Sequence, residues 1–132
     1  MGQLKNRIID WWRRQQRTVP RIDTIEYYER QSEAPISIPR QTLAIIGKGE
    51  HLKWAMFECP CGTGHKIMIN LAASRSPHWR LASDKGIPSL LPSIDYQDDH
   101  GRCHFWLRAG RVEFTPDSVR PRRRRDTLKA QS

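Results

Sequence analysis

The stretch CPCGTGH, residues Cys59 to His65, places two cysteines one residue apart and a histidine four residues after the second. Thiolate and imidazole are the ligands that zinc prefers, and a structural zinc site needs four of them. Gly62 and Gly64 favour a tight turn, where side chains and backbone can approach an ion closely. The stretch therefore predicts half of a metal site at the end of a strand.

The other half of the predicted site lies in the dipeptide Cys103-His104, just after Gly101. Neighbouring side chains on a regular strand point to opposite faces, so these two share one ion only at a bend. That geometry favours His65 as the fourth ligand, although both histidines stay candidates. A Zn²⁺ ion is thus expected to join the end of one strand to the last hairpin, with ligands drawn from Cys59, Cys61, His65, Cys103 and His104.

Two other interpretations of the cysteines remain open. Three cysteines is an odd count, and thiols that form no disulfide serve in metal binding, in catalysis or in the core. A catalytic thiol would need a base and an orienting acid near Cys61 or Cys103. Asp98, Asp99 and His104 lie close to Cys103 in the sequence, but closeness in sequence alone does not make a catalytic site.

Length and composition indicate one small soluble domain. The 132 residues suit a single modest core, and a content of 37% hydrophobic and 28% charged residues favours a globular middle over full disorder. No apolar run approaches the roughly 20 residues of a membrane span. The N-terminus carries no apolar signal region, so we expect a cytoplasmic protein.

The N-terminal segment, Leu4 to Gln16, has the pattern of an amphipathic helix, because its apolar residues recur at helical spacing. Trp11 and Trp12 belong to the apolar stripe, and Arg13 and Arg14 lie on the other face. Such a helix could cover the protein's own sheet, dock on a partner or lie on an acidic membrane.

The middle of the chain alternates short β-branched or aromatic runs with turn residues, which is typical of antiparallel strands. Ala109-Gly110 fits a two-residue hairpin turn. Pro88 and Pro92 predict an edge strand or a buried extended loop at residues 87–94. The strands are expected at residues 42–47, 52–58, 66–71, 78–82, 103–108 and 111–114.

These patterns predict a mainly β, α+β architecture: a small antiparallel zinc-stabilised domain with an N-terminal amphipathic helix. Residues 1–40 form the helix and a proline-containing extended connector with one helical turn near residues 25–30, residues 41–115 form the domain, and residues 116–132 form a basic tail. That tail holds six Lys/Arg against two Asp/Glu. Its arginines could bind phosphates or simply be solvated: Arg122, Arg123, Arg124 and Arg125.

The strings CPCGTGHKIMINL, LLPSI and HFWLRAGRVEF closely resemble a family of small bacterial and phage proteins that carry a domain of unknown function. The resemblance covers roughly residues 40–114 and implies a zinc-binding fold. That family commonly has a cysteine where Thr63 stands and another where Phe114 stands, so the ligand set departs from its pattern. Some relatives lie near genes for bacterial ubiquitin-like conjugation, which implies a protein partner of that pathway.

The favoured function is therefore a non-catalytic, zinc-stabilised interaction or adaptor module, accessory to a bacterial ubiquitin-like conjugation system. Its partner contacts would use Trp11, Trp12 and the basic flanks. The alternative is a nucleic-acid-binding protein that uses the same arginines. A hydrolytic enzyme ranks third, because PSI and HFW supply Ser93 and His104 but nothing in the sequence places them together.

Overall fold

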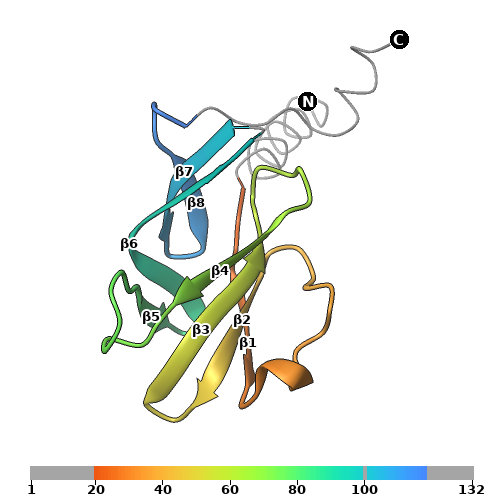
Figure 1. Cartoon of the computed structure of the whole chain (residues 1–132), viewed down its shortest axis with the longest axis vertical. Helices are drawn as coiled ribbons and strands as arrows, with labels where there is room; N and C mark the ends of the chain where they lie inside the picture. Colours follow the sequence, from red (N-terminus) through yellow and green to blue (C-terminus); the bar gives the residue numbers. More distant parts are fainter. Residues whose placement is uncertain (1–19, 100, 119–132) are drawn as a thin grey trace, which may run out of the picture.

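The computed structural model describes residues 20–99 and 101–118, and the predicted N-terminal helix and the arginine tail lie outside them. The described residues form strands and a single short 3-10 helix, so the prediction of a mainly β fold is confirmed (Figure 1). The elements are β1 (Thr24–Tyr28), η1 (Gln31–Glu33), β2 (Thr42–Lys48), β3 (His51–Glu58), β4 (Lys66–Asn70), β5 (Arg80–Asp84), β6 (Ile87–Asp98), β7 (Gly101–Arg108) and β8 (Arg111–Phe114).

The strands pair in two four-stranded sheets, in the orders β1-β2-β3-β4 and β5-β6-β7-β8. Every pair except β1–β2 is antiparallel. The predicted two-residue turn joins β7 to β8, with φ of 47° at Ala109 and 75° at Gly110. Positive φ at both positions gives the turn whose twist matches that of the flanking strands.

The first strand corrects the expectation of a helical turn near residues 25–30. Residues 24–28 form strand β1, not a helical turn, and β1 pairs in parallel with β2 through Tyr27↔Ile45. The β-branched and aromatic residues of TIEYY suit a pleated sheet, and pairing with β2 decides the conformation. Ala34 and Ile38, in the segment after β1, then pack on the outer side of β2 against Ala44 and Ile46.

Strand β6 corrects the second expectation, because residues 87–98 form one long strand between β5 and β7. Pro88 lies beyond the last β6–β7 pair, Leu90↔Leu107, so its missing N–H removes no hydrogen bond between these strands. Pro92 lies where the register shifts between Leu90 and Ile94. Both prolines thus lie at positions of a central strand where no β6–β7 hydrogen bond needs their N–H.

The main core lies between the two sheets. Phe57 of β3 meets Phe105 of β7 edge to face, with ring centroids 6.3 Å apart, and both side chains are fully buried. Alternate residues of each strand point into this layer, which also holds all three cysteines. The inner residues include Leu43, Ile45, Ala55, Ile67, Ile69, Leu90, Ile94, Leu107 and Val112.

Candidate metal centre and candidate catalytic site

The turn between β3 and β4 brings Cys59, Cys61 and His65 together. The Cys59 N–H donates to the His65 carbonyl at 2.9 Å, which closes the turn, and the Gly62 N–H donates to the Cys59 carbonyl at 3.3 Å. Gly62 and Gly64 have φ of 82° and 92°, in a region of backbone conformation that residues with a Cβ atom rarely adopt. The glycines let the chain reverse so tightly that its thiols face the core.

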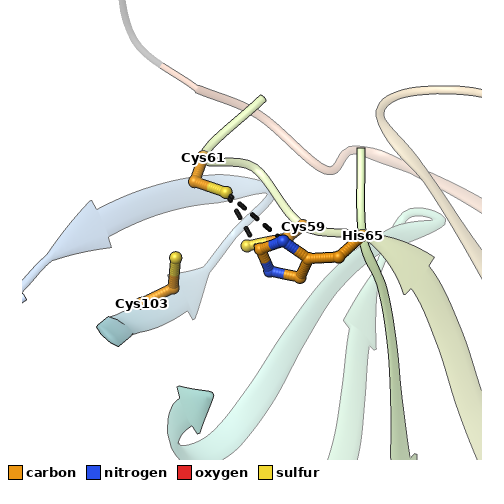
Figure 2. Close-up of side chains that lie close together, drawn as sticks. All are labelled: Cys59, Cys61, His65 and Cys103. Carbon is orange, nitrogen blue, oxygen red and sulfur yellow. Dashed lines mark hydrogen bonds between the residues drawn. The ribbon is translucent and has the colours of Figure 1, made fainter. Parts of the chain in front are cut away.

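Strand β7 supplies the fourth group, Cys103, which is fully buried. The Sγ atoms of Cys59, Cys61 and Cys103 and a ring nitrogen of His65 all lie within 4.8 Å of one another, and their side chains converge in Figure 2. A tetrahedral zinc with Zn–S bonds of about 2.3 Å needs sulfur atoms about 3.8 Å apart. The four groups therefore fit a metal ion after small adjustments, and this cluster could hold one.

His104 does not belong to this cluster. Cys103 points into the core from β7, so the next side chain points to the outer face of the sheet. His65 takes the fourth place, and its imidazole also stacks on Tyr96 with centroids 4.4 Å apart. The sequence argument favours His65 on this ground, and His65 is the histidine that lies in the cluster.

Thr63 holds the imidazole of His65 in place. Its hydroxyl lies 2.7 Å from His65 Nδ1 and 3.0 Å from Cys61 Sγ. Metal-binding histidines usually use their second ring nitrogen in this way, which fixes the ring orientation. Thr63 thus acts on two of the candidate ligands at once.

The three thiols perturb one another, because thiolates this close repel when no cation separates them. Burial raises the pKa of Cys103 to about 11. The hydrogen bond between Cys59 and Cys61, and then burial, raises the pKa of Cys59. The same hydrogen bond, together with one from Thr63, lowers the pKa of Cys61 to about 5. These shifts favour ionisation of Cys61 before Cys59 and Cys103.

Zinc binding should consequently release about two protons near neutral pH, because Cys59 and Cys103 must ionise while Cys61 already has. Raising the pH from neutral towards the pKa of Cys103 should strengthen binding by about 100-fold per pH unit. Calorimetric titration with zinc in two buffers of different ionisation enthalpy measures the proton count. Release of three protons would contradict the assignment of Cys61 as the thiolate.

On the outer face of the second sheet, Ser93, His104 and Asp117 form a hydrogen-bonded chain. Ser93 Oγ lies 2.9 Å from His104 Nε2, and His104 Nδ1 lies 3.0 Å from Asp117 Oδ1. An ionised carboxylate only accepts hydrogen bonds, so Nδ1–H donates to Asp117. In the neutral imidazole, Nε2 then accepts from the Ser93 hydroxyl. A hydroxyl, an imidazole and a carboxylate in this order can activate the hydroxyl as a nucleophile.

An irregularity in β6 places the serine. Between Leu90 and Ile94 the register shifts, so that Leu91, Pro92 and Ser93 together lie opposite a single residue of β7. The inward direction of Ile94 then leaves Ser93 on the outer face, beside His104 of β7. β6 and β7 are neighbours in Figure 1, so the serine and the histidine come from adjacent strands.

The turn after β8 places the carboxylate. The Thr115 N–H donates to the His104 carbonyl at 2.9 Å and continues the β7–β8 ladder by one residue. The chain then turns, with the Ser118 N–H donating to the Thr115 carbonyl at 3.0 Å. Ser118 Oγ accepts from the His104 N–H at 3.2 Å, in place of a further strand residue. This turn holds Asp117 over the imidazole.

Arg102 links Asp117 to a second carboxylate, Asp95. It donates two hydrogen bonds to Asp95, at 2.6 and 2.8 Å, and its third nitrogen lies 3.2 Å from Asp117. Hydrogen bonds from Thr115 and then His104 lower the pKa of Asp117, so this carboxylate stays ionised. The His104 side chain is 20% exposed, so part of the imidazole is accessible from solvent.

Sequence reasoning singled out Ser93 and His104 but did not bring them together, and it missed Asp117. The alternation of β7 carried part of the information: if Cys103 points inward, His104 points outward. Asp98 and Asp99, considered as partners of a catalytic thiol, lie at the end of β6 and in the β6–β7 turn. The carboxylate that contacts His104 is Asp117, which follows β8.

The other predicted contact residues lie outside the described residues and stay predictions: Trp11, Trp12, Arg13, Arg14, Arg122, Arg123, Arg124 and Arg125. Within the described part of the chain, no helix is long and apolar enough to cross a membrane.

Comparison with known proteins gives one match. Residues 30–115 match the sequence model of a family described as bacterial ubiquitination-like system serine protease, BubE. No curated protein and no solved structure matches the chain. The match covers more than half of the 132 residues, so the chain belongs to this family. The expected association with a bacterial ubiquitination-like system is confirmed at the level of the family.

Proposed function

We propose that this member of the BubE family is a serine hydrolase that cleaves peptide or isopeptide bonds in a bacterial ubiquitination-like system. The hydrogen-bonded chain of Ser93, His104 and Asp117 supports the proposal most strongly. The three residues come from two strands and a turn, and unrelated folds reach the same arrangement from other chain orders. The family's description as a serine protease supports it independently.

In the proposed mechanism, Ser93 Oγ attacks the substrate carbonyl carbon while His104 Nε2 takes the hydroxyl proton. The amine leaves with that proton, and the acyl group stays on Ser93 as an ester. Water then attacks the ester, again with His104 as the base, and releases the acid and free Ser93. Asp117 keeps the imidazole in the required tautomer and stabilises its positive charge.

For the metal cluster we propose a structural Zn²⁺ ion bound by Cys59, Cys61, His65 and Cys103. Four protein ligands leave no open position for water or substrate, as in structural rather than catalytic zinc sites. The ion would supply a cross-link between the β3–β4 turn and β7, one residue before His104.

The expectation of a non-catalytic adaptor explains the link to a ubiquitination-like system, but it gives no role to the Ser93–His104–Asp117 chain. Catalysis is therefore our first proposal, with a polypeptide of that pathway as substrate and the cytoplasm as location. The nucleic-acid alternative depends on arginines outside the described residues.

Hydrolysis of p-nitrophenyl acetate, a small ester that needs only the reacting groups, tests this function. Replacing Asp117 with asparagine should lower kcat by about 10³- to 10⁴-fold, because the amide favours the wrong imidazole tautomer. The matched control is Asp84→Asn, an exposed acid at the β5–β6 turn, which should keep the wild-type rate. Equal rates for the two variants would contradict the role of Asp117.

A further inference from the structure

Strand β6 has an open edge that begins at the nucleophile. Its pairing with β5 ends at Arg80↔Leu91, two residues before Ser93. Asp98 and Gly101 pair with each other at the end of the β6–β7 ladder. Because outward and inward main-chain groups alternate, the N–H and C=O of Asp95 and Gln97 point away from β7. Within residues 20–99 and 101–118, no main-chain partner reaches these groups.

Trp79 explains why the edge stays open. Its own N–H donates to the Asn70 carbonyl at 2.8 Å, so the chain before β5 turns away to the end of β4. Its indole Nε1–H donates to the Ser93 carbonyl at 3.1 Å. The indole therefore occupies the Ser93 carbonyl at one end of the edge and leaves the groups of Asp95 and Gln97 beyond it accessible. Both of these residues are exposed.

We propose that the β6 edge from Ser93 to Gln97 binds the substrate segment that precedes the scissile bond, as an added antiparallel strand. This inference rests on the proposed hydrolase function. Extended peptides commonly bind to open sheet edges through main-chain hydrogen bonds, which tolerate many side chains. An open edge strand can pair with another chain unless it is protected or has a binding role. The open edge of β6 adjoins the reactive hydroxyl.

The antiparallel direction follows from placing the segment before the scissile bond on the open edge, with Ser93 at one end of that edge. β6 runs from Ser93 to Gln97, so an antiparallel peptide approaches from Gln97 and brings its carboxyl end to Ser93. The residue before the scissile bond then lies opposite Ser93, and the third and fifth residues before it lie opposite Asp95 and Gln97. In this register the scissile carbonyl lies beside the Ser93 hydroxyl, as nucleophilic attack requires. The leaving amine lies on the side of Trp79.

This register predicts that alternate N–H groups of the bound peptide form hydrogen bonds with β6. The probe is a pool of acetylated pentapeptides, randomised at each position and ending in aminomethylcoumarin, whose release is fluorescent. N-methylation of the third residue before the coumarin removes a paired N–H and should lower the rate about tenfold or more. N-methylation of the second residue changes an N–H that points away from β6, and the rate should stay within about threefold. Equal losses, or a larger loss at the second residue, would overturn the proposal.

Two variants test the protein side of the same contact. Gln97→Pro removes an N–H that no neighbouring strand uses, and should lower the rate on the peptide pool about fivefold or more. Gln97→Ala keeps that N–H and should behave as wild type. Both variants should hydrolyse p-nitrophenyl acetate normally, because acetate has no chain to pair.

The two substrates also separate this inference from the function on which it rests. A wild-type chain that fails on p-nitrophenyl acetate would contradict the hydrolase itself. A chain that hydrolyses the ester but releases no coumarin from the pool, or whose two Gln97 variants act equally, would contradict only the edge.

Discussion

Replacing Ser93 with alanine is expected to abolish hydrolysis of both ester and peptide substrates, with a loss in kcat of about 10⁴- to 10⁶-fold. The hydroxyl is the proposed nucleophile, and it is the group that lies within hydrogen-bond distance, 2.9 Å, of His104 Nε2 in the described residues. Stopped-flow or steady-state kinetics with p-nitrophenyl acetate measure the loss. The thermal midpoint should change little, since Ser93 is only partly buried.

A second serine of the same strand is the matched control. Ser89 accepts a hydrogen bond from the Ala109 N–H at 2.8 Å, at the far end of β6 from the turn with β7. Ser89→Ala should cost about 1 kcal/mol of unfolding free energy and keep the wild-type rate. If Ser93→Ala retains more than a tenth of the activity, another group is the nucleophile.

Removing the metal is expected to unfold the domain. Replacing Cys61 with serine, or treating the chain with a strong chelator, should remove one zinc per chain and most of the β structure. Structural zinc contributes on the order of 10 kcal/mol, comparable with the whole stability of a small domain. Metal content by mass spectrometry, with circular dichroism before and after chelation, measures both effects. A chain that stays folded and cooperative without metal would contradict a structural role.

Two adjacent residues separate the metal site from the catalytic site. Cys103→Ser should lose the zinc and the fold, because its thiol faces the cluster. His104→Ala should keep the zinc and the fold and lose hydrolysis, because its imidazole faces Ser93 on the other side of β7. Loss of zinc from His104→Ala would show that the imidazole is a ligand after all.

Much of the fold follows from local patterns in the sequence. Alternation and turn residues predict the hairpins β2–β3 and β7–β8, and the Ala109-Gly110 turn sets the register of the second. The parallel pairing of β1 is not predictable this way, because TIEYY has no local partner and pairs with β2 across a long stretch of chain. β6 is a further case: its prolines indicate an interruption, and only the positions of β7 and the bulge show that a central strand accommodates them.

The two sites differ in how far sequence determines them. Cys59, Cys61 and His65 lie in one turn, and the scarcity of cysteine leaves Cys103 as the obvious third thiol. The catalytic chain depends on the face of β6 on which Ser93 emerges from the bulge and on the turn that returns Asp117 to His104. Both are tertiary features, and neither serine nor aspartate is rare enough for its position to be noticed.

Reaction with a fluorophosphonate tests the central claim most directly, because this reagent phosphonylates activated serine hydroxyls and needs no knowledge of the substrate. After incubation of the zinc-loaded 132-residue chain, peptide mass spectrometry locates the adduct. We predict one phosphonyl group per chain, on Ser93, and none in His104→Ala. Absence of an adduct from the folded protein, or an adduct on Ser89 or Ser118 instead, would contradict the assignment of Ser93 as the nucleophile.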